Sequence, residues 1–98
     1  MGDIIITREE QPTRGRYVAR MVGSEAEAEL TYSRASPVLI IADHTGVPDA
    51  FRGRGVGRAL LERMVADARV EGFKIIPLCP FVNAERKRHP DWADVFEG

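Results

Sequence analysis

Residues 51–60 have the composition and spacing of an anion-binding loop that leads directly into a helix. Their sequence, FRGRGVGRAL, alternates glycine with arginine and valine before a helical pattern begins. Glycines let the backbone approach a ligand closely, and the first N–H groups of a helix have no partner within it. Together with the guanidinium groups of Arg52, Arg54 and Arg58, these donors predict a phosphate or pyrophosphate site. The alternative is a tight glycine turn with solvated arginines.

Two other phosphate loops do not fit this spacing. A Walker A loop requires Lys and then Ser or Thr after its last glycine, whereas Arg58 and Ala59 follow Gly57. The dinucleotide fingerprint requires a third glycine where Arg58 stands, and an acidic residue at the end of the following strand, where Ile76 and Pro77 stand. The pattern that does fit is Arg/Gln-x-x-Gly-x-Gly/Ala, formed here by Arg52, Gly53, Arg54, Gly55, Val56 and Gly57.

Three further motifs flank this loop in the order of the chain. They are His44-Thr45-x-Val47-Pro48, Gly72-x-Lys74-Ile75-x-Pro77-x-Cys79-x-Phe81-Val82 and Arg88-His89-Pro90. Together with the loop, they resemble the GNAT acetyltransferase superfamily, and in particular its minimal family of N-acetyltransferase-domain-containing proteins. The resemblance covers residues from about 16 to 94, which is nearly the whole chain.

The resemblance implies where coenzyme A would bind. The loop at 52–58 would hold its pyrophosphate, and the strand that ends near His44 would lie beside its pantetheine arm. That strand would splay from its parallel neighbour, which leaves backbone groups near Thr45 and Val47 to bond the pantetheine amides. Larger members of the superfamily place a cofactor-binding Asn where Asn83 stands.

The resemblance also implies catalytic roles for two residues, since the minimal family carries Cys and His at the positions of Cys79 and His44. Larger members use a Tyr to protonate the leaving thiolate, but no Tyr follows Tyr32 in this chain. The proton donor therefore stays open between Cys79 and water. Cys79 is alternatively a nucleophile that carries the acetyl group as a thioester.

Each of these two residues also has a structural interpretation. A lone cysteine is often a small buried apolar residue, and His44 can simply cap a turn through Thr45. As a general base, acting directly or through water, His44 is suitable because imidazole titrates near neutral pH. A backbone N–H near Gly46 or Val47 is the expected oxyanion donor.

Composition narrows the class of protein. The chain has 98 residues, enough for one domain, and its 44% hydrophobic and 30% charged residues are ordinary for a soluble globular protein. A formal net charge of −1 gives no reason to expect nucleic-acid binding. The single cysteine fits a reducing compartment, and neither a membrane span nor a signal-peptide pattern is present. We expect a cytoplasmic protein without a metal.

The first part of the chain predicts strands. Residues 1–15 form either an edge strand or an arm that packs on a partner, and Ile4 to Ile6 could mediate a dimer. Strands at 16–22 and 25–32 flank Gly23-Ser24, a two-residue loop typical of a type II′ hairpin. Within the second strand, Ala and Leu positions alternate with Glu, so we expect one packed face and one wet face.

The central part predicts a parallel strand–helix–strand unit. The apolar run 38–42 suggests a strand covered on both faces, 55–70 has helical periodicity that Gly72 ends, and 73–78 is the next strand. Such a unit has a right-handed crossover and parallel pairing. The glycine loop would then lie at the carboxyl ends of parallel strands, where His44 and Cys79 would also converge.

After this unit, residues 83–88 predict a short basic helix or turn, and 89–92 a turn. Pro80 fits the first position of a helix, where a missing N–H costs nothing. We expect Trp92, Val95 and Phe96 to close the core against the sheet.

These patterns predict a single α/β (α+β) domain over 1–98, with a GNAT-like mixed twisted sheet, one parallel strand–helix–strand unit and a short C-terminal helix. The expected function is acetyl-CoA-dependent transfer of an acetyl group to a primary amine, on a small molecule or a protein lysine. The alternatives are a non-catalytic acyl-CoA-binding module and a pure interaction protein. Partners would include neither nucleic acid nor membrane, and we expect a monomer or weak homodimer.

Overall fold

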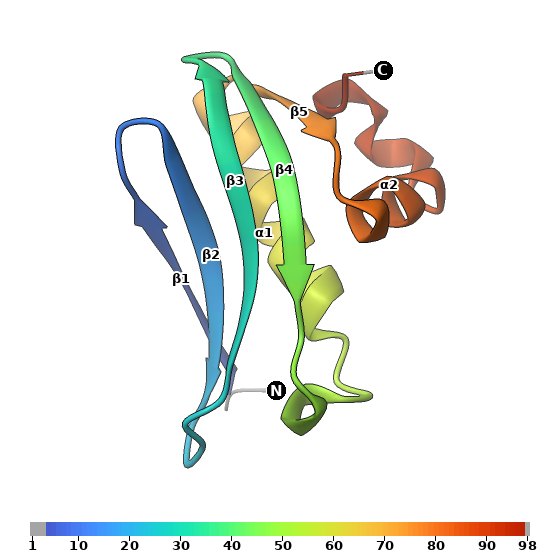
Figure 1. Cartoon of the computed structure of the whole chain (residues 1–98). Helices are drawn as coiled ribbons and strands as arrows, with labels where there is room; N and C mark the ends of the chain where they lie inside the picture. Colours follow the sequence, from blue (N-terminus) through green and yellow to red (C-terminus); the bar gives the residue numbers. More distant parts are fainter. Residues whose placement is uncertain (1–3, 98) are drawn as a thin grey trace.

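Strands of one mixed sheet and the helices that follow them make up the fold (Figure 1). A computed structural model describes residues 4–97, and within that range the sheet has five strands in the order β1-β2-β3-β4-β5. The elements are β1 (Ile4–Glu10), β2 (Arg14–Met21), β3 (Glu27–Ser36), β4 (Leu39–Gly46), the 3-10 helix η1 (Asp49–Phe51), α1 (Val56–Glu71), β5 (Lys74–Pro77), α2 (Pro80–Lys87) and the 3-10 helix η2 (Pro90–Val95).

The strand pairing confirms the expected mixed α/β (α+β) fold. β1 to β4 are antiparallel, and β4 pairs in parallel with β5 after the α1 crossover. The pairing of β4 with β5 ends at Ala42 and Pro77, whereas β4 continues to Gly46. Residues 43–46 therefore extend beyond the last β5 pair, which is the predicted splay.

Helix α1 lies within one residue of the range 55–70 that its apolar periodicity predicts. Gly72 ends it in the left-handed conformation, with φ 81°, and donates its N–H to the Ala68 carbonyl at 2.8 Å. The buried side of the helix consists of Val56, Gly57, Leu60, Leu61, Met64, Val65 and Ala68. It packs against the inward residues of the sheet, Tyr17, Ala19, Ala28, Leu30, Tyr32, Ile40 and Ala42. We call the opposite side of the sheet the outer face.

The β2–β3 hairpin differs from the prediction of a two-residue type II′ loop. Pairing ends at Arg20 and Glu27, so the connection is longer. Its turn is closed by the Ser24 N–H, which donates to the Met21 carbonyl at 3.1 Å. Gly23, with φ 83°, is the second central residue of that turn and not the first. A turn with positive φ at its second central residue has the type II pattern, in which Gly is favoured at that place.

The prediction that the 38–42 strand is covered on both faces is also wrong. Ile40 and Ala42 are buried, but Leu39 and Ile41 are half-buried and Val38 is 61% exposed. A helix covers only the side of β4 that carries Ile40 and Ala42. Continuous apolar sequence does not distinguish a doubly covered strand from one whose second face is partly wet.

Of the two alternatives for the first residues, the structure has the strand: β1 lies at the edge of the sheet, and residues 1–3 lie outside the described range. At the other end of the chain, α2 begins at Pro80 as predicted. Trp92, Val95 and Phe96 are buried against the core, which confirms their expected position. Over residues 4–97, neither helix is long and apolar enough to span a membrane.

An arginine from the edge strand points into the space between the sheet and α1. The Arg8 side chain is 13% exposed and donates to the Tyr32 hydroxyl, Asp67 and Glu71. Its guanidinium carbon lies 5.4 Å from the Tyr17 ring centroid. The Tyr17 hydroxyl donates to Asp67 at 2.9 Å. Burial, and then this hydrogen bond, raise the pKa of Tyr17, so the hydroxyl remains a neutral donor.

Arg8→Met should therefore destabilise the fold substantially. The substitution keeps the apolar stem but removes the cation that Asp67 and Glu71 share. Asp67 keeps its pair with Arg63 at 3.3 Å, so we expect a loss of about 2 kcal/mol, less than for a buried charge left without any partner. Urea unfolding followed by circular dichroism measures the free energy of unfolding. The matched control is Arg20→Met on β2, because Arg20 bonds Glu27 and Glu9 on the exposed outer face, where pairs contribute little. Equal losses in both variants would contradict this account.

Candidate functional site

The glycine loop forms the entry to α1 and leaves backbone donors at the helix start. Gly53 and Gly55 have φ angles of 76° and 66°, a region that favours glycine, and Gly55 is the N-cap of α1. The first helical hydrogen bond runs from the Ala59 N–H to the Gly55 carbonyl at 3.0 Å. The N–H groups of residues 56–58 precede this bond, so they have no acceptor within the helix. This geometry is suited to an anion.

A hollow of about 390 Å³ opens at this helix start. We call it the cofactor hollow, after the cofactor site that the sequence predicts at this place. Residues of the predicted cofactor site that line it are Thr45, Val47, Arg52, Gly53, Gly55, Val56 and Gly57. The splayed end of β4 thus meets the phosphate-type loop in one concavity.

Two aromatic residues that were not predicted as site residues complete the cofactor hollow. Phe51, buried at the end of η1, and Phe81, from the first turn of α2, line its walls. A Cβ atom on Gly57 would lie 3.0 Å from the Phe81 ring and 3.5 Å from Val47. Any side chain at position 57 would therefore fill the space between Val47 and Phe81. The alternation of glycines signalled this close approach, but which aromatic rings would face it depended on the tertiary fold.

Cys79 does not line the cofactor hollow, but it contacts Thr45, which does. Its side chain is 3% exposed, and its Sγ lies 3.3 Å from the Thr45 Oγ1. The Cys79 N–H donates to the Ala42 carbonyl of β4 at 2.9 Å, and Cys79 is the N-cap of α2. Cys79 therefore sits at the point where β4 and β5 separate.

His44 does not lie on the same side of β4 as Cys79. Register pairs Thr45 with the buried Leu30, and His44 with Thr31 of the outer face. Directly opposite residues of an antiparallel pair share a face, so His44 faces outward. The sequence placed His44 and Cys79 at the ends of neighbouring strands, but the twofold alternation along a strand puts residues 44 and 45 on opposite sides.

The remaining predicted cofactor residues lie outside the lining of the cofactor hollow. Arg58 pairs with Glu62 one turn along the helix, and Arg54, which lies within the loop, does not line the hollow either. Asn83 lies on α2, where its Oδ1 accepts a bond from Arg86 at 3.0 Å. Arg52, which does line the hollow, pairs with Asp49 at 2.9 Å, and both side chains are at least 80% exposed. Such exposed pairs are weak, so an incoming phosphate can compete for the arginines.

A second hollow lies on the outer face, immediately across the end of β4. It measures about 490 Å³ and is lined by Arg16, Glu27, Glu29, Gly46, Val47 and Pro48. We call it the outer hollow. Val47 lines both this hollow and the cofactor hollow, so the end of β4 separates two concavities. Sequence reasoning did not identify Glu27 and Glu29 as site residues, because their alternation indicated only a wet face.

Comparison with known proteins places this geometry in a family. The family model described as GCN5-related N-acetyl-transferase matches residues 16–95. The chain belongs to the GCN5-related N-acetyltransferase family, and its domain is of the acetyltransferase class.

Similarity is found both to protein sequences and to a solved structure. Protein NATD1 of Xenopus tropicalis is 30% identical over 77 residues, which cover 79% of this chain and 71% of that protein. Protein NATD1 of Homo sapiens is 29% identical over a segment that covers 79% of this chain and 68% of that protein. The solution structure of a GCN5-like candidate N-acetyltransferase from Staphylococcus aureus is similar with a TM-score of 0.76 and 33% identity, covering 100% of this chain and 92% of that one.

Proposed function

We propose that this protein transfers the acetyl group of acetyl-CoA to a primary amine. The observation that carries the proposal is the cofactor hollow, in which a glycine loop at a helix N-terminus meets the splayed end of β4. A helix start of this kind binds phosphate groups through backbone N–H donors and the helix dipole. Membership of the GCN5-related N-acetyltransferase family supports the same activity.

Gly57 is the reason that the cofactor hollow is suited to coenzyme A. Without a side chain at position 57, a ligand can approach the backbone N–H groups at the start of α1. A Cβ on Gly57 would approach Phe81 to 3.0 Å. The backbone donors of residues 56–58 and the exposed Arg52 would hold the pyrophosphate, and residues 43–46 of β4 would offer backbone groups to the pantetheine amides. When bound, acetyl-CoA supplies an acetyl group that is already activated as a thioester.

The chain must then position the amine, accept its proton and supply one to the departing sulfur. The amine nitrogen forms the C–N bond while the C–S bond breaks, one proton leaves the nitrogen and one reaches the sulfur. We assign the first proton to His44, directly or through water. A backbone N–H near Gly46 or Val47 would stabilise the carbonyl oxygen.

For the second proton we assign the Thr45–Cys79 pair. Thr45 lines the cofactor hollow, and its Oγ1 is 3.3 Å from the Cys79 Sγ. A proton can therefore pass from Cys79 through the Thr45 hydroxyl to the leaving thiolate. Direct transfer of the acetyl group needs only this proton, which Cys79 regains from solvent, whereas a covalent route would need the Cys79 sulfur itself to reach the acetyl carbon, although this residue is 3% exposed and does not line the cofactor hollow.

Acetyl-CoA consumption in the presence of a panel of primary amines tests the proposal. We expect CoA release and an acetylated amine, both measured by mass spectrometry, and a raised melting temperature with CoA alone. Stabilisation by CoA without transfer to any amine would favour a non-catalytic acyl-CoA-binding module, and neither effect would favour an interaction protein.

The intact mass of the protein after incubation with acetyl-CoA alone tests the route. We expect no stoichiometric acetyl group on Cys79 and reduced turnover by Cys79→Ser. An acetyl group on Cys79 that passes to added amine would establish the covalent route instead. Undiminished turnover by Cys79→Ser would leave the residue a structural role.

A further inference from the structure

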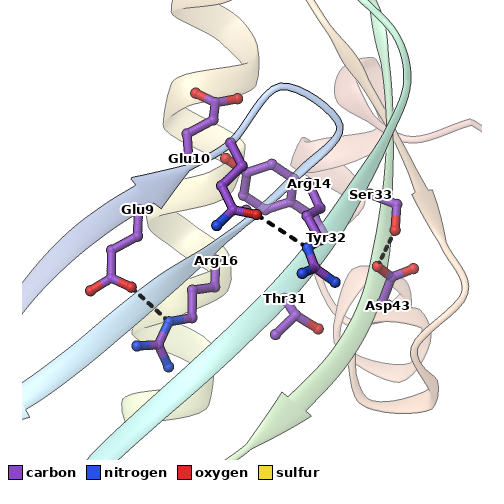
Figure 2. Close-up of a pocket in the computed structure, with 10 residues that line it drawn as sticks. Glu9, Glu10, Arg14, Arg16, Thr31, Tyr32, Ser33 and Asp43 are labelled. Atoms are coloured by element: carbon purple, nitrogen blue, oxygen red, sulfur yellow. Dashed lines mark hydrogen bonds and ion pairs between the residues drawn. The ribbon is translucent and has the colours of Figure 1, made fainter.

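The outer face of the sheet carries a charged trough that leads to the end of β4. The larger part of it, a hollow of about 570 Å³, is shown in Figure 2 with Glu9, Arg16, Thr31 and Asp43 on its walls. The outer hollow continues it, and Arg16 lines both. Because Val47 then lines both the outer hollow and the cofactor hollow, the trough ends beside the acetyl donor's expected position.

Carboxylates outnumber guanidinium groups along this trough. On the outer face the linings of its two parts include the carboxylates of Glu9, Asp43, Glu27 and Glu29 and the guanidinium groups of Arg14 and Arg16, and Arg20 pairs with Glu9 and Glu27. Glu10 also lines the larger part, but it pairs with Arg8 and Arg34. The arginines are also held in place, since Arg16 donates to Glu9 at 2.8 Å and to Glu29 at 2.9 Å. The remaining excess of negative charge is small, but it favours a cation over an anion.

Glu29 is a carboxylate that lies directly across from the end of β4. It pairs in register with Gly46, and its Cγ would lie 3.9 Å from a Cβ on that glycine. The His44 Nε2 would lie 3.4 Å from the same point. The missing side chain of Gly46 therefore leaves a space that Glu29 and His44 flank together, on the face that the amine must approach.

A carboxylate that already pairs with an arginine can still bind an ammonium group. Its two oxygens offer about four lone-pair directions, and Arg16 uses Oε1 of Glu29. The Glu29 side chain is 33% exposed, so part of it is open to solvent.

We propose that Glu29, with Glu27 beside it, selects an alkylammonium acceptor by binding its charged nitrogen in the outer hollow. This inference rests on the proposed acetyltransferase function and adds the class of substrate. The ammonium group binds at Glu29 and releases its first proton to solvent, and the neutral amine then faces the end of β4, where His44 accepts the proton that leaves the nitrogen during transfer. A lysine side chain and a free diamine share this chemistry. Amines that carry a carboxylate near the nitrogen, such as amino acid α-amines, are disfavoured.

Steady-state kinetics at saturating acetyl-CoA test the role of Glu29. We expect Glu29→Gln to raise the KM for a diamine roughly tenfold, because a charge-assisted hydrogen bond is lost at a partly exposed site. The KM for acetyl-CoA should not change. The matched control is Glu25→Gln, which makes the same charge change on an exposed residue outside both hollows.

Arg16→Met is the second variant, and its expected effect has the opposite sign. Removal of this guanidinium makes the outer hollow more negative, so the KM for the diamine should fall severalfold. A merely structural Arg16–Glu29 pair would give changes of the same sign in both variants, and this outcome would overturn the proposal. So would an unchanged diamine KM in folded Glu29→Gln.

Two alternative amine substrates distinguish a protein lysine from a small free amine as the acceptor. The first is putrescine, and the second is a short peptide with one internal lysine and blocked ends. Preference for the peptide identifies a protein lysine, and preference for putrescine identifies a small amine. A wild-type protein equally active on an anionic amine would overturn the proposed selectivity while leaving the transferase activity intact. No transfer to any amine would overturn both.

Discussion

Gly57→Val should abolish coenzyme A binding in a protein that still folds. The added side chain would occupy the space between Val47 and Phe81, where even a Cβ would approach the Phe81 ring to 3.0 Å. A ligand could then no longer reach the N–H groups of the first turn of α1. Losing two or more charge-assisted bonds to phosphate lowers affinity by roughly a hundredfold or more. Isothermal titration calorimetry with CoA measures the affinity.

The helix start also offers a control that separates strain from obstruction. Gly55 and Gly23 both have positive φ, and a Cβ on either would meet no atom within 4 Å. Gly55→Ala and Gly23→Ala should therefore destabilise the fold to a similar extent, about 1–2 kcal/mol each. CoA affinity should fall in Gly55→Ala alone, because only its strain is at the loop. Normal CoA affinity in folded Gly57→Val would refute the location of the pyrophosphate.

His44→Gln should lower kcat by a factor of about 10² to 10⁴, the usual contribution of a general base. Since His44 faces the outer side of β4, opposite the side that Thr45 shares with Leu30, CoA affinity should be unchanged. Rapid-quench measurement of acetyl-amine formation separates the transfer step from product release.

His89→Gln is the matched control for this variant. His89 stacks on Trp92 with ring centroids 4.0 Å apart and lines none of the three hollows. The substitution His89→Gln should therefore leave kcat unchanged. An undiminished kcat in His44→Gln would leave His44 only a structural role in β4, and Glu29 would then be the next candidate base.

The parallel unit was predictable because its signals are local. Apolar steps along α1 and the stop at Gly72 define a helix without reference to any neighbour, and a strand–helix–strand run of that length allows one handedness. The hairpin was less predictable, since Gly23 fits either central position of a turn. The side to which a residue points depends on register, and the shift between Thr31 and Tyr32 inserts Asp43 as an extra residue in β4.

The parts of the candidate site that are close together in the sequence were predictable. The loop at 52–57 and the end of β4 are close along the chain, and each carries a motif of its own. Phe81, Glu27 and Glu29 come from elements that sequence spacing does not relate to the loop. Alternating Glu residues on β3 indicated a solvated surface, and only the paired strands show that Glu29 lies opposite Gly46.

The inward position of Arg8 has a consequence for association between molecules. β1 is an edge strand, and an unprotected edge can add a strand from another chain and so begin aggregation. An inward-pointing charge makes such an edge a poor template, because a continued flat sheet would have to bury or displace the guanidinium. Arg8 is held between Tyr17 and Tyr32, and charged Glu9 and Glu10 follow it. Arg8, which links β1 to α1 through Asp67 and Glu71, thus also opposes the addition of a strand from another chain at the β1 edge.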